Sequence, residues 1–320
     1  MKRNYGLDII KLLAIIMVVI THSYIGKEYS NYFVFPYLIE IAVPVFLVVS
    51  AYLNTASLDR GGVQKYYLFD NMTRRVARIL LPFLIVVIFE IIWCLTHGDG
   101  FSVILKKLVF GLWGDGGYYP YILIQFTFIF PFIYRATKKT TGFCTIILLN
   151  VLFEAFTSFG FIPELVHRIC ILRYFGIIVS GILLYRYYAW FTVKRTAVIG
   201  IVGAIIVGLN YYTFIFRNIF RYWYSTCILC SAYTVALVAC TLMIKCDRNK
   251  LIETLSKLGK ATYQICLFQM LWFFVIRHSD SIMEPFVLVS IVCCIGVGFV
   301  WYMFDERIQR RIFDRNIVNK

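Results

Sequence analysis

About ten apolar stretches, each close to the length that crosses a bilayer, follow one another along this chain of 320 residues. A helix needs about 20 predominantly apolar residues to span the hydrocarbon core. The composition, 61% hydrophobic and only 15% charged, is typical of a polytopic membrane protein. The pattern therefore predicts an all-α integral membrane protein with about ten transmembrane helices. The expected spans are 7–26, 32–55, 78–97, 119–137, 142–160, 168–186, 195–214, 222–244, 261–277 and 284–304.

The segments between these spans are short and rich in Lys and Arg. With the N-terminus in the cytoplasm, the inner loops carry about 22 basic residues and the outer loops about 7. The positive-inside rule then predicts a multi-pass plasma-membrane protein with both termini cytoplasmic. Loop charges of this kind also explain the formal charge of +15, so no nucleic-acid partner is expected. We expect one membrane domain over residues 1–320, with no appended soluble domain.

The first span, LDIIKLLAIIMVVITHSYIG, contains three ionisable residues, Asp8, Lys11 and His22. Ionisable side chains inside a membrane helix are costly and usually face an interior path. Lys11 and His22 are eleven residues apart, which is roughly three helical turns, so both project from one face about 16 Å apart. Asp8 lies one turn from Lys11 on the same side. The span therefore predicts a buried stripe with a cation near one membrane surface and an imidazole near the other.

Two further groups are candidates for the chemistry. Glu40, in the second span, is the expected partner of His22, because sequential helices are usually neighbours and a carboxylate holds an imidazole tautomer. A hydrogen-bonded packing residue is the alternative for Glu40. Arg75 and Arg78 share a helical face and are suited to clamp phosphate, although positive-inside anchoring explains them as well.

These positions fit a coenzyme A thioester. A donor whose phosphates are held at the inner face by Lys11, Arg75 and Arg78 would have to reach about 15–20 Å to His22. A phosphopantetheine arm has that order of length. The stripe therefore predicts that an acyl-CoA enters from the cytoplasm and meets an acceptor on the outer side.

Five segments resemble the acyltransferase-3 family of integral membrane O-acyltransferases. They are LDIIKLLAIIMVVITHS, VPVFLVVSAYL, RRVARILLPFL, LGKATYQICLFQM and WYMFDERIQRRI, in the family's order. The resemblance implies about ten helices, an acyl-CoA donor, with acetyl-CoA as the expected one, and transfer to a hydroxyl of a surface or exported carbohydrate. It also implies that His22 is the essential histidine, Lys11 the basic residue of the first helix, and Arg75 and Arg78 the arginine motif. Gln269 stands where many members have histidine.

Two other functions remain open at this stage. A transporter or flippase for an anionic or lipid-linked glycan also accommodates buried charges and ten helices, but it predicts repeated halves that we do not find. A non-catalytic scaffold leaves the stripe of Lys11 and His22 unexplained. No metal is expected, since Cys227-x-x-Cys230 has no matching second pair. The acceptor and an assembly of several copies are left open.

Overall fold

The computed structural model describes residues 4–23, 35–213, 227–244, 249–278 and 286–318. Within these ranges every regular element is helical, so the predicted all-α class is confirmed. The α-helices and the three short 3₁₀ helices are α1 (Tyr5–His22), α3 (Phe35–Leu38), α4 (Ala42–Tyr66), α5 (Phe69–Thr96), α6 (Phe101–Phe110), α7 (Tyr119–Ala136), α8 (Thr140–Ser158), α9 (Glu164–Ile169), η1 (Ile171–Tyr174), α10 (Phe175–Arg186), η2 (Tyr188–Trp190), α11 (Val193–Tyr212), η3 (Ile228–Cys230), α13 (Ser231–Met243), α14 (Lys250–Lys260), α15 (Thr262–Arg277) and α16 (Val287–Val318).

Six candidate spans in the described part are long and apolar enough to cross a membrane. They are Tyr5–His22, Phe35–Tyr66, Phe69–Thr96, Thr140–Ser158, Val193–Tyr212 and Val287–Phe313. The four other expected spans correspond to α7, α10, α13 and α15, and the last two are shorter apolar helices. The structure therefore shows several apolar helices long enough to cross a membrane, and the number of ten spans stays a prediction.

Several helices extend past the boundaries expected from hydropathy. The second expected span ends at residue 55, but α4 continues to Tyr66, with a break in helical geometry at Gly62, where φ is 73°. The third span is expected to begin at residue 78, but α5 begins at Phe69. Hydropathy marks only the lipid-facing part of a helix, whereas backbone hydrogen bonding continues through polar residues that leave the membrane. The arginines of α5 are therefore presented on a rigid helix.

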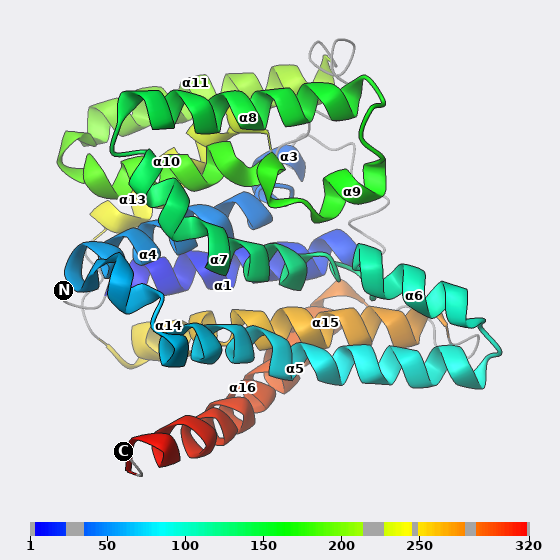
Figure 1. Cartoon of the computed structure of the whole chain (residues 1–320). Coiled ribbons are helices and arrows are strands. Elements are labelled where there is room, and N and C mark those ends of the chain that lie inside the picture. Colours follow the sequence, from blue (N-terminus) through cyan, green and yellow to red (C-terminus); the bar gives the residue numbers. More distant parts are fainter. Residues whose placement is uncertain (1–3, 24–34, 214–226, 245–248, 279–285, 319–320) are drawn as a thin grey trace.

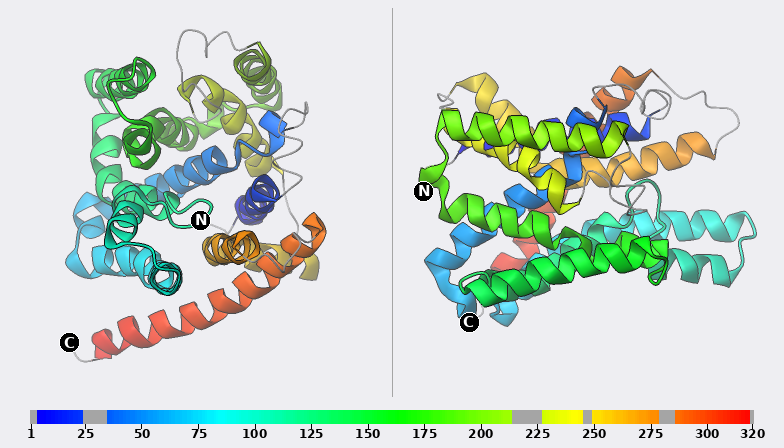
Figure 2. Two further views of the ribbon diagram at one scale, coloured as in Figure 1. Left: turned by 90° about the vertical axis from the view of Figure 1, so that its right-hand side faces the viewer. Right: turned by 90° about the horizontal axis from the view of Figure 1, so that it is seen from above.

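α1 runs through the middle of the bundle (Figure 1). It packs against α4, α13, α14, α15 and α16. The approach of α14 is very close, because a Cβ placed on Gly259 would overlap the carbonyl oxygen of Asp8. α16 lies along the edge of the bundle, and its C-terminal end projects beyond the neighbouring helices (Figure 2). Residues from both ends of the chain are thereby brought to the same side.

Candidate functional site

The stripe predicted on the first helix borders a cavity of about 390 Å³. Lys11, Val18 and His22 from α1 all line this space, which we call the His22 cavity. Because α1 is one continuous helix from Tyr5 to His22, Lys11 and His22 lie about 16 Å apart along its axis. The prediction that both side chains share a face is confirmed. α4, α7 and α15 contribute the opposite walls.

Asp8 and Lys11 form an ion pair, with 2.9 Å between Lys11 Nζ and Asp8 Oδ1. The Ser256 hydroxyl donates to the other oxygen, Asp8 Oδ2, at 2.7 Å. Asp8 therefore supports Lys11 as the spacing predicted, and it also ties α1 to α14. Lys11 lines the His22 cavity and not the cavity of the arginines, so its contact with donor phosphates stays a prediction.

At the other end of the stripe, His22 faces an acid that sequence reasoning missed. His22 Nδ1 lies 3.7 Å from Asp115 Oδ2. Arg277, at the end of α15, forms an ion pair with the same carboxylate and donates from Nη2 to the His22 carbonyl oxygen at 2.9 Å. A proton held on Nδ1 toward a carboxylate leaves the basic lone pair of an imidazole on Nε2. The arrangement can therefore support a histidine base.

Glu40, the carboxylate that the sequence indicated as the partner of His22, lies in the turn between α3 and α4 and lines the same cavity. Tyr118, Tyr119 and Arg173 line it as well. The structure thus brings Glu40 and His22 to one cavity. The role of Glu40 as the orienting group of His22 stays a prediction. The carboxylate that lies within ion-pair distance of the His22 ring is that of Asp115.

The loop that carries Asp115 is anchored by a buried ion pair. Lys107 Nζ of α6 lies 3.3 Å from Glu90 Oε2 of α5, and the Glu90 side chain is fully buried. Gly114 lies directly against this carboxylate, since an added Cβ would be 3.1 Å from Glu90 Oε1. Trp113 is also fully buried and donates to the Tyr121 hydroxyl at 3.1 Å. The Gly-rich segment is therefore a docked structure that holds Asp115 in place.

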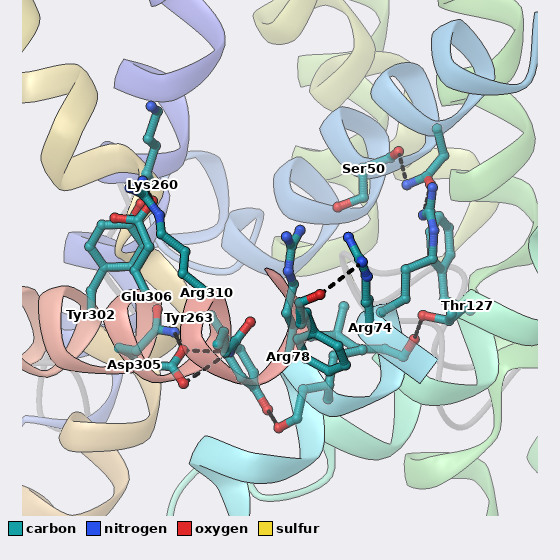
Figure 3. A pocket seen from close by; sticks show the side chains of 18 of the residues that line it. Ser50, Arg74, Arg78, Thr127, Lys260, Tyr263, Tyr302, Asp305, Glu306 and Arg310 are labelled. Carbon is teal, nitrogen blue, oxygen red and sulfur yellow. Dashed lines mark hydrogen bonds and ion pairs between the residues drawn. The ribbon is translucent and has the colours of Figure 1, made fainter. Parts of the chain in front are cut away.

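A second cavity, of about 500 Å³, is lined by Arg74, Arg75 and Arg78 of α5, and we call it the arginine cavity (Figure 3). Arg75 donates from Nη1 to Asn54 Oδ1 of α4 at 2.8 Å, and its guanidinium lies 4.0 Å from the centre of the Tyr66 ring. The prediction that Arg75 and Arg78 share a helical face is confirmed, since both line this cavity. Fixed guanidinium groups of this kind suit phosphate, because their donors match its oxygens.

The far wall of the arginine cavity comes from α16, whose Phe313 is 239 residues away from Arg74 of α5. Arg74 Nη2 donates to the carbonyl oxygen of Phe313 at 3.2 Å, and its guanidinium lies 5.6 Å from the Phe313 ring centre. Asp305 accepts from Gln264 at 2.7 Å and is also bound by Gln309. These contacts fix α16 against α5 and α15 and close the cavity on that side.

Three residues line both cavities: Ser50, Leu123 and Tyr263, which we call the neck. The Tyr263 hydroxyl donates to the carbonyl oxygen of Ile79 at 2.8 Å, so its position is held by α5. On α4, Phe46 lines the His22 cavity, Asn54 lines the arginine cavity, and Ser50 between them lines both. Positions four apart share a helical face. The two cavities therefore adjoin end to end along one face of α4.

The family model of the acyltransferase-3 family, described as an acyltransferase domain, matches residues 4–305. No curated protein and no solved structure matches the chain. The matched range contains His22, Asp115, the α5 arginines and the neck. Because the match covers nearly the whole sequence, the chain belongs to the acyltransferase-3 family and is an acyltransferase.

Proposed function

We propose that the protein is a membrane O-acyltransferase that moves an acyl group, most simply acetyl, from cytoplasmic acyl-CoA to a hydroxyl of a surface or exported carbohydrate. The observation that carries this proposal is the pairing of two cavities across the neck. One is lined by the α5 arginines and the other by His22. In this orientation the arginine cavity faces the cytoplasm, and the chain lies in the plasma membrane with both termini inside.

The donor binds with its phosphates in the arginine cavity. Arg75 and Arg78 supply charge-assisted hydrogen bonds to the diphosphate. The pantetheine arm passes the neck, where Ser50, Leu123 and Tyr263 line the path, and brings the thioester into the His22 cavity. Lys11, at the far end of the stripe from His22, lies near this path and attracts the anionic donor inward.

The reaction then needs one proton to move twice. His22 Nε2 takes the proton of the acceptor hydroxyl as the oxygen attacks the thioester carbonyl carbon, and Asp115 steadies the imidazolium that forms. The new C–O bond forms and the C–S bond breaks. The thiolate leaves and takes the proton from His22, which restores the neutral imidazole. A general base of this kind typically contributes about 10²–10⁴-fold in rate.

The acceptor occupies the His22 cavity on the outer side. Tyr118 and Tyr119 offer ring faces on which a sugar can stack, and Glu40 and Arg173 offer polar contacts to its hydroxyls. Glu40 is placed where it can orient either His22 or the acceptor. A carbohydrate matches this lining because it presents apolar C–H faces and many hydroxyl groups together.

The test is vectorial transfer in proteoliposomes. Purified protein is reconstituted in vesicles with radiolabelled acetyl-CoA on one side and a membrane-impermeant oligosaccharide on the other. We expect labelled ester only when acetyl-CoA is on the side of the arginine cavity, identified by a tag on the C-terminus. His22→Ala vesicles are the control for chemistry. Equal transfer from either side would refute the proposed path, and no transfer to any glycan would refute the acceptor class.

A further inference from the structure

The arginine cavity has a second basic wall that the arginine motif of α5 does not include. Lys260, at the C-terminal end of α14, and Arg310, on α16, both line the cavity. In Figure 3 they lie on one side of the cavity, while Arg74 and Arg78 lie on the other. With Arg75, the lining holds five cationic side chains against two acidic ones. This excess of positive charge is larger than a diphosphate alone needs.

The path of the donor separates these cations into two groups. Arg75 is bonded to Asn54, one turn of α4 from Ser50 in the neck. The pantetheine arm leaves from the diphosphate, so the diphosphate belongs beside Arg75, next to the neck. Arg74 is already tied to the Phe313 carbonyl on α16. The remaining phosphate of coenzyme A, the 3′-phosphate on its ribose, is separated from the diphosphate by the sugar and therefore meets a different part of the lining, where the other wall offers Lys260 and Arg310.

Arg310 has a partner that a phosphate can displace. Arg310 Nη2 lies 2.8 Å from Glu306 Oε1, one turn earlier on α16, with side chains 70% and 43% exposed. Exposed pairs of this spacing are weak because water screens them. A phosphomonoester carries about −1.5 to −2 charge near neutral pH. It therefore attracts Arg310 and Lys260 more strongly than the single carboxylate does.

We propose that Lys260 and Arg310 form a subsite for the 3′-phosphate of the donor, separate from the Arg75 and Arg78 site for its diphosphate. This inference rests on the proposed function, since it concerns the same donor. The subsite makes the enzyme selective for coenzyme A thioesters over acyl carriers that have the same arm but lack this phosphate. Glu306 opposes the bound phosphate and limits the affinity.

The experiment compares two ligands that differ only in that group, acetyl-CoA and 3′-dephospho-acetyl-CoA. Equilibrium binding of each is measured on the purified full-length protein, wild type and variants. We expect the wild type to bind acetyl-CoA about tenfold more tightly. In Lys260→Gln/Arg310→Gln this preference falls below about threefold, while the affinity for the dephospho ligand is unchanged. Glu306→Gln should strengthen binding of acetyl-CoA by about twofold and change binding of the dephospho ligand less.

Matched controls come from the same helices. Lys257→Gln on α14 and Arg311→Gln on α16 remove exposed cations at positions outside the cavity lining and should keep the wild-type preference. Arg75→Gln should weaken both ligands by the same factor, because the diphosphate is common to them. The ratio of the two affinities is measured within one preparation, so a variant that folds incompletely still gives a valid ratio.

Three outcomes overturn the subsite. They are equal wild-type affinity for the two ligands, an unchanged preference in the Lys260→Gln/Arg310→Gln variant, and equal weakening of both ligands in that variant. In each case donor binding at Arg75 still stands. A wild-type protein that binds neither ligand would refute the acyl-CoA donor itself and the subsite with it. The assignment is supported if the preference for acetyl-CoA is lost in the Lys260→Gln/Arg310→Gln variant and kept in the control variants.

Discussion

Replacement of Asp115 by Asn tests how the candidate base is held. Asp115 Oδ2 lies 3.7 Å from His22 Nδ1, and Arg277 forms an ion pair with the same carboxylate. Two unit charges about 4 Å apart attract each other by about 4 kcal/mol at an effective dielectric constant of about 20. Arg277 has the opposite sign, and the His22 and Asp115 side chains keep 25% and 22% exposure. We therefore assign about 1.4–2.7 kcal/mol of imidazolium stabilisation to Asp115, which corresponds to a rate about 10–100-fold slower in Asp115→Asn.

The measurement is single-turnover acetyl transfer at saturating acetyl-CoA, with donor affinity measured in parallel. The donor affinity should not change, because Asp115 lies in the loop between α6 and α7, away from the arginine cavity. Asp99→Asn is the matched control, since Asp99 is an exposed acid in the loop between α5 and α6. Glu40→Gln is assayed in the same way, because Glu40 lines the His22 cavity and is the carboxylate that the sequence indicated as the partner of His22.

Transfer by Asp115→Asn at the wild-type rate would refute the reasoning. If Glu40→Gln were then slow, the carboxylate that steadies His22 would be Glu40. If both variants were as fast as the wild type while His22→Ala was inactive, the imidazole would act without a carboxylate partner. A loss of donor affinity in Asp115→Asn would instead show that the loop between α6 and α7 supports the whole site.

Three other changes test separate parts of the site. His22→Ala should lower the rate of single-turnover transfer by about 10²–10⁴-fold and leave acetyl-CoA binding unchanged. Transfer by this variant at the wild-type rate would show that His22 has a structural role only. Arg75→Gln and Arg78→Gln should each weaken acetyl-CoA binding, measured by titration, by about 1.5–3 kcal/mol. Unchanged affinities would show that the arginines of α5 do not bind the donor. Lys107→Met leaves the Glu90 carboxylate buried without its partner and should destabilise the protein by about 3–5 kcal/mol in thermal or denaturant unfolding. A second change, Glu90→Gln, should recover much of that loss, and no recovery would show that Lys107 acts through other contacts.

The part of the site that lies on one helix was predictable from the sequence. Asp8, Lys11 and His22 fall on one face because helical periodicity is local and α1 has no break. Arg75 and Arg78 follow the same rule on α5. The existence of apolar helices was predictable for a similar reason, since about 20 apolar residues in a row have few alternatives.

The contacts between distant segments were not predictable in this way. Asp115 lies in a Gly-rich segment with no periodicity, and its position beside His22 depends on long-range contacts such as the ion pair between Glu90 and Lys107. A single acid between glycines, in WGDGG, was the one available signal. The α16 wall of the arginine cavity depends on packing between helices far apart in the sequence, such as the contact of Arg74 with Phe313.

The neck has a consequence for the membrane itself. In the orientation that we propose, the two cavities open to opposite sides of the bilayer, so the neck has to admit a thioester and yet keep protons and ions from leaking between two compartments. Leu123 contributes an apolar surface, and Tyr263 is fixed by its bond to the Ile79 carbonyl. In that orientation these side chains form the barrier to ions and protons when no donor molecule is bound. Replacement of Ser50, Leu123 or Tyr263 by a smaller residue should therefore raise ion leakage across the bilayer as well as change acyl transfer.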